Sequence, residues 1–378
     1  MGLQQHPARV PTPDRAEVIF TPTFAALSLA AGTCGGTTHF QRTLAIANTL
    51  RGQPWFSGRP QDHLLLNGVA SAMRNPLGEL GELVSGRGGR AACLDSKLCG
   101  FFKAERMLPL PWPPLPALQT RAVRALVNEE ACGRRSAGGG GGGAGASARG
   151  VTIFYRGTLG RSKESQDLRV RLLMLKQISG SQVSLVSPSE GGSEKLLPTA
   201  ALYASKNQLS GSRLKRMDGD TYASRMLGAR FCLCPVGDVA TPAGRLFDAI
   251  AAGCVPIIIG LVDRAALPLA RQIDYGKFAA FVSRPAFMKD PAYAIEALYN
   301  RLEPQLPIMR RALADARHRL IWGVTDDGPM LSANGSSLSG GSAPNFGAVA
   351  PMLLREHKLA TMGTPAGGGA PPAGLIRA

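Results

Sequence analysis

Hydrophobic and polar positions follow a strand–loop–helix–strand pattern in the second half of the chain. The stretch RFCLCPVGDVATPAGRLFDAIAAGCVPIIIG (230–260) places two short apolar runs on either side of a Gly/Pro/Thr loop and an amphipathic segment. This order predicts a βαβ unit in which FCLCP and CVPIII are neighbouring parallel strands, covered on both faces. In such units, ligands bind beyond the carboxyl end of the first strand. The loop and helix after FCLCP are therefore where we expect function.

The same alternation of strand and helix patterns recurs along the chain and predicts an α/β fold class. AEVIFTPTFAALSLAAG (16–32) begins as a strand and continues as a helix, and the strand VTIFYRG (151–157) precedes the helical LRVRLLMLKQI (168–178). Composition divides the chain into an N-terminal domain (1–131), a glycine-rich insert (132–150), a Rossmann-like domain (151–322) and a low-complexity tail (323–378). We expect the tail to be disordered, with APMLLREHKLA (350–360) as the exception.

The predicted helix RLFDAIAAG carries two residues suited to a nucleotide. Arg245 and Asp248 share one face of it, and Gly253 ends it. Amides at a helix N-terminus favour phosphate, the forked donors of arginine fit phosphate oxygens, and a carboxylate can accept both hydroxyls of a ribose. The alternative is a solvated intrahelical ion pair worth a few tenths of a kcal/mol, roughly.

Charge and cysteine content narrow the classes of partner. The formal net charge of +17 favours polyanionic partners, but aromatic residues make up only 6% and the basic residues are scattered, so we expect no nucleic-acid binding. Seven cysteines without C-x-x-C spacing predict no metal site. They suit either a reducing compartment or a lumenal protein with one or two bridges. Cys232 and Cys234 share one strand face and read first as small core residues. No apolar run is long enough to span a membrane, so we expect the chain as given to be soluble.

Several motifs together resemble the exostosin-like glycosyltransferases of the plant and algal type. FCLCPVGD, RLFDAIAAG and CVPIII are similar to that family's F-C-L-x-P strand, R-L-F-[DE]-A-I helix and G-C-[IV]-P-V-I strand. VIFTPTFAALS, GRPQDHLLL and VTIFYRGTLGR resemble three further segments in the same order. The resemblance covers residues 16–322 and is strongest over 151–160 and 222–283.

The resemblance implies a GT-B-like architecture with two Rossmann-like domains, the first of them incomplete because few residues precede its first strand. It implies an inverting enzyme that transfers a sugar from a nucleotide-sugar, UDP-linked, to a cell-wall, matrix or protein-linked glycan. It implies no metal or other cofactor, because arginines and helix dipoles neutralise the leaving diphosphate. It also implies the Golgi apparatus, with a membrane anchor that is missing from this sequence.

The resemblance assigns roles to individual residues. The donor-binding residues that it implies are Arg156, Gly157, Arg230, Thr241, Arg245 and Asp248. Asp62 and His63 fall on the acceptor side, where either would be the catalytic base or orient it. Their plainer interpretation is a turn cap beside a partly buried histidine, and that of Arg156 is a surface cation. Asp-Gly-Asp at 218–220 imitates a metal motif of another architecture, and we interpret it as a polar loop.

One departure from the family pattern keeps other functions open. Ala243-Gly244 stands where the family has Ser-Arg or Ser-Ser, which removes a hydroxyl that Thr241 would have to replace. The alternatives are a non-catalytic glycan- or nucleotide-binding paralogue and a basic polyanion-binding protein.

Overall fold

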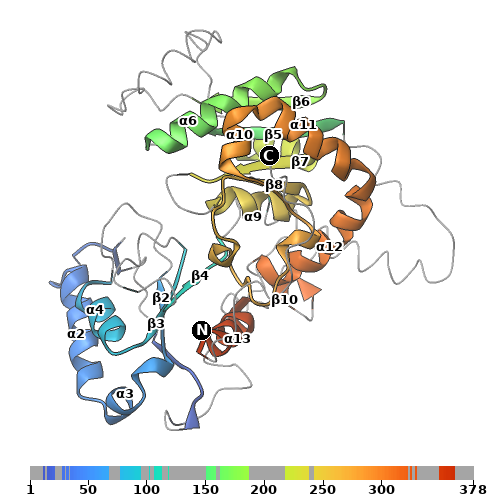
Figure 1. Ribbon diagram of the computed structural model, residues 1–378. Helices are drawn as coiled ribbons and strands as arrows, with labels where there is room; N and C mark the ends of the chain where they lie inside the picture. The colour runs from blue at the N-terminus through green and yellow to red at the C-terminus, as the bar shows by residue number, and fades with distance from the viewer. Residues whose placement is uncertain are drawn as a thin grey trace, which may run out of the picture. The chain divides into compact units, whose positions relative to one another are not determined.

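The structure is a computed structural model in which the chain forms two compact units (Figure 1). Unit 1 comprises residues 1–112, 264–273 and 339–368, and unit 2 comprises residues 113–263, 274–338 and 369–378. The residues that the structure describes are 12, 15–21, 28–29, 31–33, 35–67, 77–94, 102, 106–112, 118, 150–158, 162–186, 218–237, 242–321, 324–325, 328–329 and 349–361. The predicted glycine-rich insert therefore lies outside the described residues, except for its last position.

Unit 2 is built on a five-stranded parallel sheet in the order β6-β5-β7-β8-β9. The strands are β5 (Val151–Thr158), β6 (Ser181–Val186), β7 (Ala229–Pro235), β8 (Val255–Ile259) and β9 (Ala280–Val282). Numbered along the chain, the order is that of flavodoxin-like doubly wound sheets. The prediction that FCLCP and CVPIII are neighbouring parallel strands is confirmed, with Phe231 paired to Val255 and Pro235 to Ile259.

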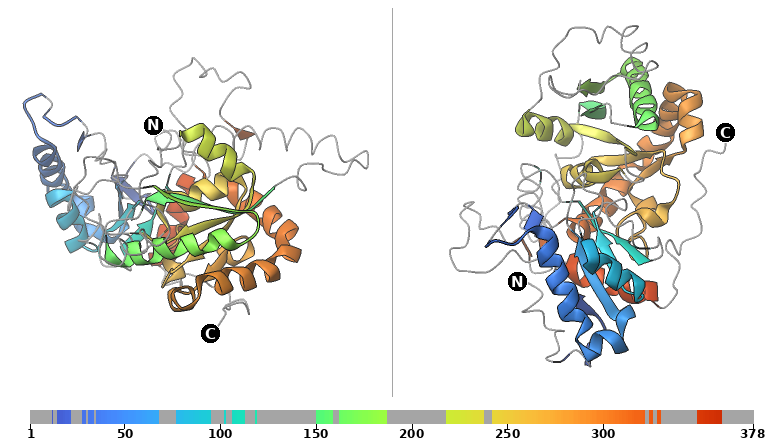
Figure 2. Two further views of the ribbon diagram at one scale, coloured as in Figure 1. Left: turned by 90° about the horizontal axis from the view of Figure 1, so that it is seen from above. Right: turned by 90° about the vertical axis from the view of Figure 1, so that its left-hand side faces the viewer.

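Helices cover both faces of this sheet, which is why its central strands are almost wholly apolar (Figures 1 and 2). One face packs on α6 (Lys163–Arg171), the 3-10 helix η6 (Leu172–Gln177), α10 (Arg284–Lys289) and α11 (Pro291–Leu302). The other faces α8 (Gly219–Leu227) and α9 (Ala243–Ala252), and α12 (Leu306–Leu320) packs against α9. The remaining elements of this unit are η8 (Tyr275–Lys277), η9 (Glu303–Gln305), β10 (Val324–Thr325) and β11 (Gly328–Pro329). As predicted, Gly253 ends α9, in the left-handed conformation at φ 64°.

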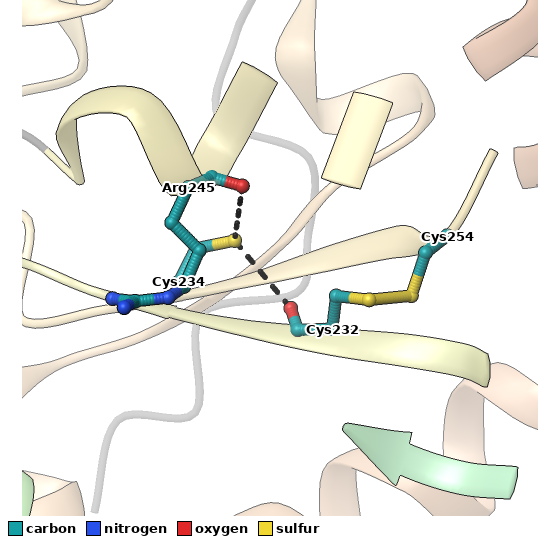
Figure 3. The surroundings of a disulfide bond; sticks show 4 residues. All are labelled: Cys232, Cys234, Arg245 and Cys254. Carbon is teal, nitrogen blue, oxygen red and sulfur yellow. Dashed lines mark hydrogen bonds between the residues drawn. A yellow bond between two sulfur atoms is a disulfide. The ribbon is translucent and has the colours of Figure 1, made fainter. Parts of the chain in front are cut away.

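A disulfide joins Cys232 in β7 to Cys254, the residue before β8 (Figure 3). The bridge closes the chain around α9. It corrects the interpretation of Cys232 as a simple core residue, whereas Cys234 is a free, buried thiol as that interpretation requires. The Cys234 thiol donates to the carbonyl oxygens of Cys232 and Arg245. Cys93 in unit 1 is also disulfide-bonded.

Unit 1 has a four-stranded parallel sheet in the order β1-β2-β3-β4, so both units are Rossmann-like α/β structures. Its strands are β1 (Ile19–Thr21), β2 (His63–Asn67), β3 (Arg90–Cys93) and β4 (Met107–Pro109). The core on one side of the sheet is formed with α2 (His39–Arg51), α3 (Pro54–Gly58) and α4 (Gly78–Gly86), while η3 (Pro60–Asp62) leads into β2. The α/β fold class predicted from the sequence is confirmed.

Two late segments of the chain complete unit 1. They are residues 264–273, with η7 (Arg264–Ala266), and α13 (Val349–Thr361) near β4. Glu356 of α13 is 2% exposed and accepts hydrogen bonds from Arg271 Nη1 and Gln272 Nε2, both at 3.0 Å. Arg90 Nη2 donates to the carbonyl oxygen of Ala360 at 3.0 Å. A packed helix thus stands inside the predicted disordered tail, close to the exception named at 350–360.

Two histidines are buried together in unit 1. His63 is 0% and His357 1% exposed, and no nitrogen of either ring has a hydrogen-bond partner among the described residues. His63 stacks on Trp55. Burial lowers the pKa of His63 to about 4. The nearby Asp62 carboxylate raises this pKa, and Arg59 lowers it. Burial likewise lowers the pKa of His357 to about 4, with Arg90 and His63 adding to the effect and Asp62 opposing it.

We predict that unit 1 loses stability as the pH falls from 7 to 4. An unfolded histidine has a pKa of about 6.5. Between 6.5 and 4 the unfolded chain therefore binds protons that the folded chain excludes, and acidification favours unfolding. The loss is at most about 3 kcal/mol per histidine. Denaturant unfolding at stepwise pH measures it. His357→Leu should flatten the profile, and parallel profiles in the wild type and this variant would contradict the prediction.

We also predict that the Cys232–Cys254 bridge stabilises unit 2 by about 3 kcal/mol, the chain-entropy value for a loop of 22 residues. The double variant Cys232→Ala/Cys254→Ala should unfold at correspondingly lower denaturant. Cys234→Ala is the matched control, because it removes a buried sulfur from the same strand without cutting a cross-link. Variants are preferable to a reductant, which would also break the bridge at Cys93. Equal losses in the two variants would show that packing, not the cross-link, is responsible.

Candidate functional site

The two central strands of unit 2 separate toward their carboxyl ends. β5 pairs with β7 only as far as Phe154 opposite Cys232, although β5 stays paired with β6 up to Thr158 and β7 stays paired with β8 up to Pro235. The strand order reverses at this same point, since β6 and β7 both adjoin β5. Ligands of doubly wound sheets bind at such a switch point, outside the carboxyl ends of the strands.

Arg245, in the first turn of α9, extends its side chain into the opening between the strands. Its Nη2 donates to the carbonyl oxygen of Arg156 at 3.0 Å. Arg156 lies beyond Phe154, the last residue of β5 that pairs with β7. The guanidinium carbon lies 4.6 Å from the centroid of the Tyr155 ring, a cation–π distance. A Cβ at Gly157 would overlap Arg245 Nη2, so only glycine leaves room for this guanidinium. Figure 3 shows the guanidinium pointing away from the disulfide.

Polar groups from three elements surround Arg245. Tyr222 of α8 is hydrogen-bonded to it, and burial raises the pKa of the Tyr222 hydroxyl. Burial also raises the pKa of Cys234 to about 12, so this thiol stays neutral. Asp248 is only 8% exposed and lies near enough to act on Arg245, Tyr222 and Cys234. Arg245 and Asp248 therefore belong to a buried cluster and are not the solvated ion pair of the alternative interpretation.

The N-terminus of α9 opens toward the same edge of the sheet. The residue before its first turn is Pro242, and no side chain of a described residue caps the first amides. Uncapped amides at a helix N-terminus are donors for an anion. The preceding loop, 238–241, lies outside the described residues, and with it the predicted donor residue Thr241.

Arg156 and Gly157 both lie at the carboxyl edge of the sheet and contribute different groups to it. Gly157 provides space for Arg245, and Arg156 provides its carbonyl oxygen. The Arg156 guanidinium is directed toward β6, where Nη1 lies 3.4 Å from Ser184 Oγ. Burial lowers the pKa of Arg156, and Arg225 of α8 lowers it further.

Arg230 lies at the other end of the sheet. It stands near the amino end of β7, forms an ion pair with Glu303 of η9, and donates to Thr152 Oγ1 at 3.1 Å. Its guanidinium also lies over the ring of Tyr299. These contacts tie β7 to β5 and η9, and they place Arg230 away from the Arg245 cluster. The donor-binding role expected of it stays a prediction that its location does not favour.

Asp62 and His63 also lie at an amino end, that of β2. Asp62 forms an ion pair with Arg59 at 2.6 Å, and His63 is enclosed by Trp55 and Phe56. The location fits the plainer interpretation of a turn followed by a buried histidine. The catalytic role stays a prediction.

Two residues absent from the sequence-based predictions lie at the carboxyl edge of unit 2. The Tyr155 hydroxyl is buried beside Arg245, and the guanidinium of Arg169 in α6 lies against Gly237, just after β7. The sequence signals for these two residues were weak. Tyr155 supplies a single hydroxyl group in an apolar strand, and Arg169 is one basic residue in the amphipathic segment LRVRLL.

No metal or membrane element is found in the part of the chain that the structure describes. There, no group of three His, Cys, Asp or Glu side chains is arranged to hold a metal ion, and no helix has the length and apolarity to cross a bilayer. Asp-Gly-Asp at 218–220 starts α8, where the Asp218 carboxylate caps the helix by accepting from Thr221 N at 2.8 Å.

Comparisons with known proteins single out the sequence around this site. Residues 145–297 match the Exostosin GT47 domain. Probable arabinosyltransferase ARAD1 of Arabidopsis thaliana is 41% identical over 70 residues, 18% of this chain and 15% of the relative. Probable beta-1,4-xylosyltransferase IRX10L of A. thaliana is 33% identical, and probable glucuronosyltransferase GUT1 of Oryza sativa subsp. japonica 41% identical, each over 93 residues, 25% of this chain and 20% of the relative. The chain thus aligns with only a fifth or less of these relatives' lengths.

Solved structures of glycosyltransferases are also similar, at low scores. WaaG, a glycosyltransferase involved in lipopolysaccharide biosynthesis, has a TM-score of 0.34 at 13% identity, covering 77% of this chain and 81% of that one. A glycosyltransferase from Rickettsia africae has a TM-score of 0.36 at 10% identity, covering 86% and 81%. Scores this low support no conclusion about this chain. The stretch that matches the Exostosin GT47 domain, by contrast, contains β5, β7, α9 and β8, the elements that form this site.

Proposed function

We propose that this chain is a glycosyltransferase that binds a UDP-linked sugar at the carboxyl edge of unit 2 and transfers the sugar to a glycan. The observation that carries the proposal is the Arg245 guanidinium in the opening between β5 and β7, at the switch point of the sheet within the stretch that matches the Exostosin GT47 domain. A cation held there, beside the uncapped first turn of α9, suits a diphosphate.

The residues at this edge suit the departure of a nucleoside diphosphate. Negative charge grows on the diphosphate as the bond to the sugar breaks, and a fixed guanidinium and helix amides stabilise that charge more than the ground state. Asp248 would either accept the ribose hydroxyls or hold Arg245 in place. In a GT-B arrangement the acceptor would bind to unit 1, and a base there would deprotonate its attacking hydroxyl, inverting the anomeric centre.

Substrate and compartment are proposed more broadly. The relatives' names specify arabinosyl, xylosyl and glucuronosyl transfer, so we propose a cell-wall, matrix or protein-linked glycan as acceptor and leave the sugar open. The disulfides at Cys232–Cys254 and Cys93 suit an oxidising compartment, and we propose the Golgi lumen.

Donor hydrolysis across a panel of UDP- and GDP-sugars tests the activity without knowledge of the acceptor. We expect slow release of UDP from one or two UDP-sugars and none from GDP-sugars. UDP binding without turnover would instead favour the non-catalytic paralogue. Salt-sensitive binding of heparin or DNA, with no nucleotide binding, would favour the polyanion-binding protein.

We predict that Arg245→Ala weakens UDP binding by about 10- to 100-fold, the loss typical of a charged hydrogen-bond partner. UMP, which lacks the terminal phosphate, should lose less. Turnover of the donor should fall further than binding does, because the charge on the diphosphate is greatest in the transition state. Calorimetric titration of both nucleotides measures the difference. Arg230→Ala is the matched control at the other end of β7, and it should reduce stability but not affinity; equal affinities in all three proteins would contradict the prediction.

Asp248→Asn distinguishes the two roles proposed for that carboxylate. If Asp248 accepts the ribose hydroxyls, affinity for UDP, UMP and uridine should fall together. If it acts by holding Arg245, affinity for UDP should fall most and that for uridine should not change.

We predict that Gly157→Ala weakens UDP binding about as much as Arg245→Ala does while the fold remains intact. The new methyl group overlaps Arg245 Nη2 and comes within 2.7 Å of Tyr155 Oη. The arginine tip is flexible, so it should move away and leave the strand in place. Gly219→Ala is the matched control, because a Cβ there meets nothing within 4 Å. Thermal unfolding and UDP titration of both variants check this, and normal UDP binding by Gly157→Ala would contradict it.

A further inference from the structure

Tyr155 has a polar atom in a place where an apolar side chain would pack as well. The residue is 1% exposed, and its ring belongs to the apolar core between the sheet and α6. Its hydroxyl has no hydrogen-bond partner among the described residues. Buried hydroxyls are nearly always satisfied, because leaving one unpaired destabilises the fold. Phenylalanine would avoid that penalty, so the hydroxyl needs another explanation.

The Tyr155 hydroxyl and the Arg245 guanidinium converge on one position beside Gly157. A Cβ built on Gly157 would lie 2.7 Å from Tyr155 Oη and would overlap Arg245 Nη2. The two atoms therefore approach one point beside the Gly157 Cα, close enough together for one ligand oxygen to accept from both. The Tyr155 ring also lies under the guanidinium at 4.6 Å, so the two side chains fix each other's position.

The chemistry of the two groups defines what fits between them. A guanidinium only donates hydrogen bonds, and a phenol beside it is best used as a second donor. Two donors that converge on one point call for an acceptor, and the positive charge favours an anionic one. In a nucleotide-sugar, the anionic acceptors are the diphosphate oxygens.

We propose that Tyr155 is a donor-binding residue whose hydroxyl donates a hydrogen bond to a diphosphate oxygen shared with Arg245. This inference rests on the proposed function and deepens it, because it assigns a neutral donor to a site otherwise formed by charge and helix amides. The glycine at 157 then has a second purpose: because it lacks a Cβ, both donors can approach the same point.

The test is Tyr155→Phe, which removes one oxygen atom and keeps the ring under Arg245. Affinity for UDP should fall about 10-fold, affinity for uridine should not change, and the melting temperature without ligand should stay the same or rise. Tyr299→Phe is the matched control, since its ring packs edge-on against Phe231 near the other end of the sheet. It should leave both affinities as in the wild type. Titration calorimetry and thermal unfolding provide these values.

Each other outcome overturns a specific part of the proposal. If the wild type binds UDP and Tyr155→Phe binds it equally well, the Tyr155 inference is wrong and the proposed function stands. Equal losses for UDP and uridine would move the contact to the nucleoside and overturn the diphosphate assignment. A lower melting temperature with unchanged UDP affinity would show a structural role only. A wild-type chain that binds no UDP would overturn the proposed function and this inference together.

Discussion

The hydrogen bond from Arg245 to the carbonyl oxygen of Arg156 is the contact on which the rest of unit 2's carboxyl edge depends. This hydrogen bond joins α9 to β5 beyond the last residue of β5 that pairs with β7. A side-chain hydrogen bond thus stands where the backbone hydrogen bonds between the two strands have ended. Withdrawing a guanidinium from water is costly unless it is paired. The Tyr155 face, the Tyr222 hydroxyl and the nearby Asp248 carboxylate meet that requirement. A cation this well restrained needs little rearrangement when an anion arrives, which is the condition for effective electrostatic stabilisation.

The sequence predicted the parts of this site that depend on local pattern. Two apolar runs flanking a short helix indicated parallel strands, because only a sheet covered on both faces tolerates such strands. The separation of β5 from β7 was not predictable from the sequence, because no residue type marks the position at which hydrogen bonding between two strands ends. The burial of Asp248 was not predictable either, because the residue lies near Tyr222 of α8 and Cys234 of β7, which are distant from it in sequence.

The end of the strand at which a polar residue lies indicates its role better than its residue type does. Arg230 directly precedes FCLCP, and Asp62 and His63 directly precede LLLN, so both sets stand at amino ends of parallel strands. Arg156 follows its apolar run and lies at the edge where ligands bind. The pairing of Cys232 with Cys254 was compatible with the sequence but not readable from it, because Cys234 lies on the same strand face. The burial of Glu356 and His357 was hidden by the low-complexity sequence around α13.

Unit 1 begins in the first hundred residues and is completed by α13, whose last residue is Thr361. During synthesis, the N-terminal strands leave the ribosome long before the helix that buries Glu356 and His357 exists. Until then, Arg271 and Gln272 lack the Glu356 carboxylate that accepts their hydrogen bonds. Unit 2 lies almost wholly between these two parts of the chain, so it can fold first. Assembly of these two units should therefore run from the middle outward, with α13 closing a sheet whose strands were translated long before it.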